Sequence, residues 1–522
     1  MAALKSPAEV QAHQLKLVLA SVGKSPWGQH LGLQSVLAKL PKKGKDAHVN
    51  FVQETETMNH ERFIRTLKGV LGLDDSPLSD DAEVLQKPGA LTKEKLAGLC
   101  HTPFNTGLLP VTVDQLTRMK EHFQQEAKKL SKRFATKPDN TFFLYNQPLR
   151  RIVGEGLLPA CGLGVLLAEP EKKMFKSQPE ALPDPQELQA AGHSTMQRLQ
   201  SYIELLQKHG NRVESLWADG RMYADLAHEM KHNTPPQRLL EMCPNLKYCF
   251  IDSASVNPNQ AGVADLFGGK DIPSFGAFYS SFGLFGHAID ESTPMYFEPV
   301  LDAGTFFEFI PLTGVDEATG LPRPTHQRLW VGNVAPDQDY LLIVSNTAGL
   351  VAYNTGVIVR VKNTEPLRLR IIGKCEYLNG LNERLSEAQT SDILANFNTA
   401  VNRAYKCYVR DYMIGDHVDR GQAIWALELS VEPRKVPPQV LKSLANRLHT
   451  ELAKTSRYYM KAFDQGGVAA PVMTFLPPGT FMQAARYPLP HLDLTLDAHQ
   501  VRKLMTFGGD RQIKLRVAKL SL

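Results

Sequence analysis

Glu308 stands among phenylalanines in the run Phe306-Phe307-Glu308-Phe309 and is a candidate general base. Alternate side chains of a strand face opposite sides, so Glu308 would take a different face from its two neighbours. Burial raises the pKa of a carboxyl group, and a raised pKa suits a base that works near neutral pH. The alternative is that Glu308 is the partner of a cation in an ion pair.

Two histidines and a short polar run complete the candidate chemistry. His101 and His287 can act as acid or base, because imidazole titrates near neutral pH; a hydrogen-bonded structural role is the alternative for each. Tyr279, Ser280 and Ser281 follow one another and can donate hydrogen bonds to a substrate carbonyl, or hold a turn.

Other common kinds of site have no support in the sequence. A Gly-x-Ser-x-Gly elbow is absent, and neither a Ser-His-Asp nor a Cys-His nucleophile pattern is visible. The six cysteines are scattered without a Cys-x-x-Cys pair, which argues against a zinc site and a disulfide framework and fits a reducing compartment. We therefore expect no metal.

The composition is that of an ordinary soluble globular protein. The chain has 522 residues, 43% of them hydrophobic and 22% charged, with a net charge of +5. Lysine and arginine do not cluster with aromatic residues, so we expect no nucleic-acid partner. A secretory signal is lacking, and the longest apolar run, around residues 157–168, is too short to span a bilayer. These features favour a cytoplasmic protein without a membrane partner.

The secondary structure predicted to position these residues changes along the chain from helices to strands. The first hundred residues read as short helices, and periodicity predicts further helices over 113–134, 186–209 and 216–230. Apolar runs then predict strands over 247–252, 304–310, 340–344 and 356–361. A strand over 423–431, a helix over 437–454 and a strand over 472–476 form a last, smaller α+β unit. The pattern predicts α/β layers with a β-rich subdomain.

The order of several segments is more specific than any one of them. Examples are Ser280-Ser281-Phe282 within 278–286 and Tyr353-Asn354-Thr355-Gly356 after the strand 340–344. Together with 244–248, 304–311, 478–481 and 512–514, and more weakly 23–33, they resemble the plant hormone-conjugating (auxin-responsive) acyl-acid amido synthetases. The collinear match covers most of the chain.

This resemblance implies the acyl-adenylate-forming fold. It implies a large N-terminal α/β domain over residues 1–379 with a β-rich subdomain, a hinge over 380–389 and a small C-terminal α+β domain over 390–522. Such enzymes use ATP with Mg²⁺ to activate a carboxylic acid as an acyl-adenylate and then pass the acyl group to an amine. The small domain rotates between the two half-reactions.

The residues that correspond to the family's nucleotide site depart from its pattern. The phosphate-binding loop resembles residues 100–112, but it is short: Pro103 has no N–H to donate, and Phe104 would crowd a polyphosphate. Phe282 stands where the resemblance places a glutamate for Mg²⁺, and Val357 where it places an aspartate for the ribose. Lys514 matches the family's lysine, although Ile513 replaces the preceding tyrosine.

The main hypothesis is therefore a repurposed enzyme that needs no cofactor. It would bind a hydrophobic natural-product intermediate and catalyse an ATP-independent cyclisation, addition or isomerisation. The residues expected to touch this substrate are Phe104, Tyr279, Ser280, Ser281, Phe282, Phe306, Tyr353 and Val357. The alternatives are a divergent amido synthetase that uses ATP and Mg²⁺, and a non-catalytic binding or scaffold protein. Neither the substrate nor the oligomeric state can be read from the sequence.

Overall fold

A computed structural model describes most of the chain. The described residues are 6–40, 47–73, 84–85, 87, 89–101, 107–137, 140–144, 151–152, 159–161, 195–232, 238–252, 266–268, 270–288, 296–375, 377–378, 384–386, 389–390, 392–398, 407–417, 422–480 and 501–506. Most of the predicted hinge, 380–389, lies outside them, so the predicted domain boundaries stay a prediction.

Five helices form the N-terminal layer: α1 (Pro7–Val22), α2 (Pro26–His30), α3 (Leu33–Lys39), α4 (Ala47–Glu54) and α5 (His60–Val70). Ser6 begins α1 with a capping box completed by Glu9. The Gln11 side chain fixes this helix to the sheet beneath it. It donates to the carbonyl oxygens of Leu301 (2.7 Å) and Thr305 (3.0 Å) and accepts from the N–H of Phe307 (2.8 Å).

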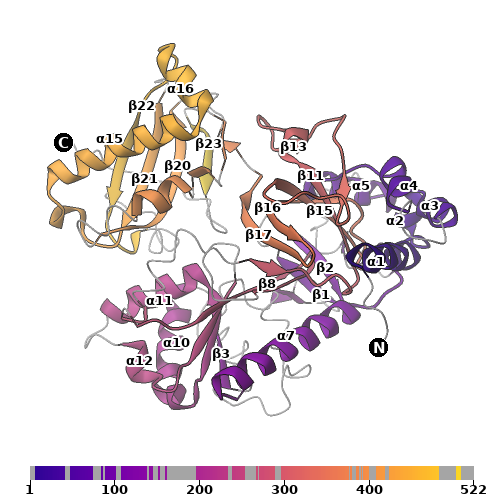
Figure 1. The fold of residues 1–522 in the computed structure, drawn as a ribbon, viewed down its shortest axis with the longest axis horizontal. Helices are drawn as coiled ribbons and strands as arrows, with labels where there is room; N and C mark the ends of the chain where they lie inside the picture. The colour runs from indigo at the N-terminus through magenta and orange to yellow at the C-terminus, as the bar shows by residue number, and fades with distance from the viewer. Residues whose placement is uncertain are drawn as a thin grey trace.

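A large mixed sheet of eleven strands is the centre of the molecule (Figure 1), in the order β14-β11-β15-β16-β17-β10-β9-β8-β7-β6-β3. Its bounds are β3 (Thr141–Phe143), β6 (Ser215–Asp219), β7 (Tyr248–Asp252), β8 (Ser274–Ser280), β9 (Gly283–Ala288), β10 (Phe297–Glu298), β11 (Thr305–Pro311), β14 (Leu329–Trp330), β15 (Asp339–Asn346), β16 (Tyr353–Thr364) and β17 (Leu367–Lys374). Strands β3, β6, β7 and β8 pair in parallel, and the others are antiparallel.

Helices α7 (Val113–Phe134), α10 (Thr195–His209), α11 (Gly220–His232) and α12 (Leu239–Met242) accompany the parallel strands. The helix predicted over 113–134 is confirmed, with a capping box at Thr112. The predicted helix over 216–230 is wrong at its start, because residues 215–219 form β6. This run is buried between two parallel strands, where a continuous apolar segment does not distinguish strand from helix.

Smaller elements flank the large sheet. Strands β1 (Leu96–His101), β2 (Leu108–Thr112), β4 (Arg151–Ile152) and β5 (Pro159–Cys161) form a sheet of order β2-β1-β5-β4. The pairs β12 (Val315–Asp316) with β13 (Leu321–Pro322), and β18 (Tyr377–Leu378) with β19 (Leu385–Ser386), are two-stranded. No helix within the described ranges is long and apolar enough to cross a membrane.

The C-terminal unit has its own sheet and core. Its sheet has the order β22-β21-β20-β23, built from β20 (Val409–His417), β21 (Gln422–Leu429), β22 (Ala469–Leu476) and β23 (Val501–Thr506). Helices α15 (Pro438–Thr455) and α16 (Arg457–Asp464) belong to this unit. Its apolar core already includes Leu385, which lies within the predicted hinge.

Candidate functional site

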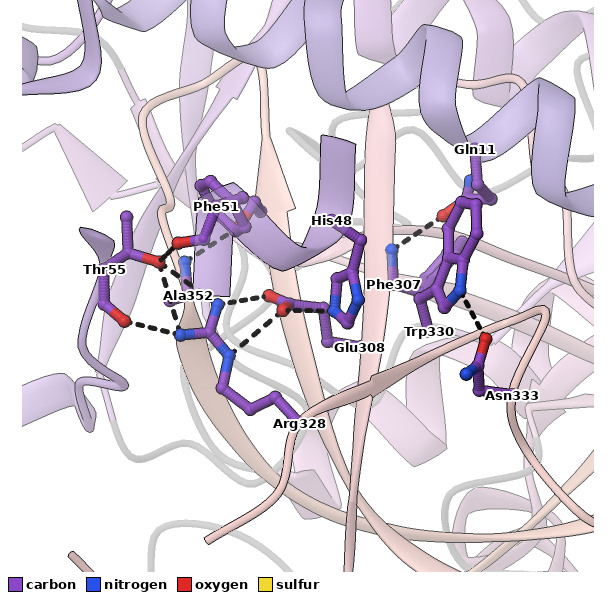
Figure 2. A network of polar contacts seen from close by, with 11 residues as sticks. Gln11, His48, Phe51, Thr55, Phe307, Glu308, Arg328, Trp330, Asn333 and Ala352 are labelled. Carbon is purple, nitrogen blue, oxygen red and sulfur yellow. Dashed lines mark hydrogen bonds and ion pairs between the residues drawn. The ribbon is translucent and has the colours of Figure 1, made fainter. Parts of the chain in front are cut away.

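Glu308 lies at the centre of a buried polar network on β11 (Figure 2). Its side chain is fully buried. Arg328 donates to it twice, from Nε to Oε1 at 3.0 Å and from Nη2 to Oε2 at 2.8 Å, and His48 Nε2 lies 3.2 Å from Oε1. Arg328 also donates to the carbonyl oxygen of Thr55 at 2.7 Å. The network therefore ties α4 and the segment after it to the sheet.

The electrostatic balance of this network opposes the raised pKa that the sequence suggested for Glu308. Burial by itself raises the pKa of the carboxyl, but the charge of Arg328 and the hydrogen bonds from His48 and Arg328 outweigh burial and lower the pKa below its ordinary value. The raised pKa expected from the sequence is wrong for this reason. Of the two sequence-based interpretations, the structure has Glu308 as an ion-pair partner.

The described parts of the three segments that the resemblance assigns to a nucleotide site lie close together, around Tyr353. Phe282 and Tyr353 lie with ring centroids 5.8 Å apart. Val357 follows on the same strand. The three side chains are 1%, 2% and 0% exposed and belong to one apolar core with Phe306.

His60 joins this group to the end of the loop before β2. Its Nδ1 lies 3.1 Å from the hydroxyl of Tyr353. On the other side of the ring, a Cβ added to Gly107 would stand 2.0 Å from Nε2, so the backbone of Gly107 packs directly on the imidazole. Burial raises the pKa of the Tyr353 phenol, which therefore keeps its proton. Sequence reasoning missed His60; Asn59 before it caps α5, and no motif marks the histidine.

The remaining predicted site residues lie on or beside strands β1, β8 and β9, or outside the described residues. Ser280 and Ser281 are buried where β8 ends, and the Ser280 Oγ accepts the N–H of Phe282 at 3.0 Å, as in a turn. His101 ends β1, Tyr279 lies on β8 and His287 on β9, each described in its backbone only. Phe104 and Lys514 lie outside the described residues.

Phe282 and Val357 do not fit a magnesium–nucleotide complex. Neither side chain can ligate a metal or accept a hydrogen bond, and both are enclosed by other apolar groups. Within the described ranges, no three His, Cys, Asp or Glu side chains are placed to hold a metal ion. Any nucleotide would have to be held without carboxylates at these two positions.

Comparison with known proteins identifies the fold. Residues 299–374 match the model of the GH3 family central domain. The structure is similar to the GH3.15 acyl acid amido synthetase, with a TM-score of 0.68, 14% identity and coverage of 92% of this chain and 88% of that one. A second match, AtGH3.15 acyl acid amido synthetase in complex with 2,4-DB, has a TM-score of 0.66, 13% identity and coverage of 92% and 89%.

A 2-hydroxyisobutyryl-CoA ligase in the postadenylation state also matches, with a TM-score of 0.52, 11% identity and coverage of 90% of this chain and 86% of that one. No curated protein is significantly similar in sequence. The chain has the acyl-adenylate-forming fold that the resemblance implied. Within this fold, residues 299–374 are similar to the GH3 family central domain.

Proposed function

We propose that this chain is a divergent acyl-acid ligase of the amido synthetase type, which activates a small carboxylic acid with ATP and joins it to an amine. The observation that carries the proposal is the extent of the structural likeness to the GH3.15 acyl acid amido synthetase, which spans 92% of this chain. The similar proteins are named as a synthetase and a ligase. This favours the ligase alternative over the ATP-independent hypothesis.

A second candidate keeps the ATP-independent chemistry expected from the sequence. It is a cyclisation, addition or isomerisation of a hydrophobic molecule, in which positioning and hydrogen bonds supply the catalysis. The buried Phe282 and Val357 favour it, because they place apolar groups where the resemblance calls for carboxylates. We further infer a cytoplasmic location, since the described cysteines are free thiols and the composition is that of a soluble protein.

One titration separates the two candidates. The purified protein is titrated with ATP and Mg²⁺ by calorimetry, and pyrophosphate release is followed with a panel of aliphatic, aromatic and hydroxy acids. The ligase proposal predicts binding and acid-dependent pyrophosphate release, with an affinity weakened by the missing carboxylates. Each missing charge-assisted contact costs about 1.5–3 kcal/mol. No binding at millimolar nucleotide would reject the ligase and leave the ATP-independent candidate.

A further inference from the structure

The C-terminal unit meets the large part of the molecule at α11 (Figure 1). The contact includes a buried ion cluster. Arg410 of β20 has a side chain only 7% exposed, and its Nη1 donates to Oε1 of Glu428 on β21 at 3.1 Å. Its Nη2 lies 3.7 Å from Oδ1 of Asp225 on α11. One arginine therefore links a carboxylate of its own unit to a carboxylate of the opposing helix.

Glu428 also holds the turn at residues 477–480. Its Oε1, which accepts from Arg410, accepts the N–H of Gly479 at 2.9 Å. The turn is closed by Thr480, whose hydroxyl donates to the carbonyl oxygen of Pro477 at 2.7 Å. The position of Arg410 and the position of the turn are thus fixed by one carboxylate.

The turn and the arginine dock on one face of α11. Gly479 has a φ of +80°, and a Cβ there would stand 2.9 Å from Nε2 of His228. His228 and Asp225 are three residues apart on the helix and therefore lie on the same face. Glycine is needed at position 479 for both its backbone conformation and this close approach.

We propose that Arg410 is a positioning residue, which is oriented by Glu428 and docks the 477–480 turn on α11 by pairing with Asp225. Arg410 and Glu428 belong to one unit, so undocking would break the Arg410–Asp225 pair and leave the Arg410–Glu428 pair intact. A second ionic contact, Arg384–Glu317 at 3.7 Å, has side chains about one-third exposed and is more strongly screened by solvent. The less exposed Arg410–Asp225 pair is therefore the stronger of these two ionic contacts between the units.

The test measures the distance between the two parts in the protein without any ligand. Spin labels are attached to Lys208→Cys on α10 and Lys442→Cys on α15, both exposed positions. The described native cysteines are buried, and Cys161→Ser removes the one whose side chain is not described. Asp225→Asn keeps the shape of the side chain but removes its charge, and we expect it to increase the long-distance population at least about fivefold, since about fivefold is already the upper effect of an exposed ion pair.

Two controls make the result specific. Asp114→Asn breaks the Asp114–Arg118 pair, which lies within α7, and should leave the distance distribution unchanged. Asp225→Glu keeps the charge and should restore most of the docked population. An Asp225→Asn distribution identical to that of the unmodified protein would overturn the proposal, even with a lowered Tm, because Asp225 would then have only a stabilising role. The measurement involves no turnover, so its outcome is independent of whether the protein is a ligase.

Discussion

The hydroxyl of Tyr353 lies 3.1 Å from Nδ1 of His60, and this contact joins the start of β16 to the first turn of α5. Because burial raises the pKa of the Tyr353 phenol, its O–H is retained and can donate to Nδ1. The other ring nitrogen of His60, Nε2, faces Gly107. The contact lies where the described parts of the three segments that the resemblance assigns to a nucleotide site meet.

Removal of this contact should reveal an energetic coupling. We expect Tyr353→Phe and His60→Ala each to lower the free energy of unfolding, since each removes one partner of a buried hydrogen bond. The coupling energy of the double-mutant cycle should be about 0.5–1.5 kcal/mol. Urea denaturation of the four proteins measures it. Additive single effects would show that the hydroxyl and the imidazole do not interact in solution.

Gly107 should tolerate a side chain only when His60 is removed. The Cβ of Gly107→Ala would stand 2.0 Å from His60 Nε2, so the imidazole or the strand start must shift. Overpacking of this kind costs about 1–3 kcal/mol. In a His60→Ala background the same substitution should cost clearly less, as measured by thermal unfolding of all four proteins. An equal cost in both backgrounds would contradict the packing described for Gly107.

Glu308→Gln should be strongly destabilising, because it leaves Arg328 as an uncompensated buried cation. Loss of one partner of a buried ion pair costs about 3–5 kcal/mol. A matched control is Glu298→Gln, whose partner Arg368 lies 3.2 Å away in a more exposed pair. The control should lose at most about 1 kcal/mol in the same urea experiment. Similar losses for both variants would argue against a special role for burial.

The same carboxyl predicts how stability responds to acid. The folded-state pKa of Glu308 lies below its ordinary value of 4.5, so the folded protein binds the proton less readily than the unfolded chain. The stabilisation is present above pH 4.5 and is lost as the pH falls through the folded-state value. Urea midpoints of the unmodified protein and Glu308→Gln should therefore converge in acid. Parallel curves would contradict the lowered pKa.

Val357→Asp should not restore a nucleotide site but should instead disrupt the core. A carboxylate at this fully buried position is costly when ionised, so its pKa should rise and the damage should grow as the pH increases from 4 to 8. Val357→Thr has nearly the shape of valine and no charge, and its smaller loss should not depend on pH. Thermal unfolding across this range compares them. If Val357→Asp released pyrophosphate only when a carboxylic acid substrate was added, the position would face substrate.

Long periodic elements could be predicted from the sequence, and contacts between distant segments could not. The helix 113–134 is marked by an amphipathic stripe that local spacing specifies fully. The strand at 215–219 was missed because a buried apolar run has no such periodicity. The sequence marks Glu308 as a charged residue in an apolar run, but its pKa depends on His48, 260 residues away, and on Arg328.

His60 illustrates the same limit at the candidate site. It is separated from Tyr353 by 293 residues, and the pairing arises only because the chain after α4 lies along the start of β16. There the N–H of Met58 donates to the carbonyl oxygen of Ala352 at 3.1 Å, and that of Asn354 donates to the carbonyl oxygen of Met58 at 2.7 Å. Backbone pairing of this kind leaves no signature in side-chain types. A single sequence therefore indicates the motifs and not the residue that joins them.

The Gln11 and Glu308 contacts limit which segments of the chain can be exchanged between related proteins. The segment that matches the GH3 central-domain model, 299–374, supplies neighbouring strands of one continuous sheet and is bound on its helical side by Gln11 and His48. Excised alone, it would carry a buried carboxylate and arginine without their helical cover. The segment is therefore not an exchangeable module: a chimera between relatives must transfer the first sixty or so residues with it.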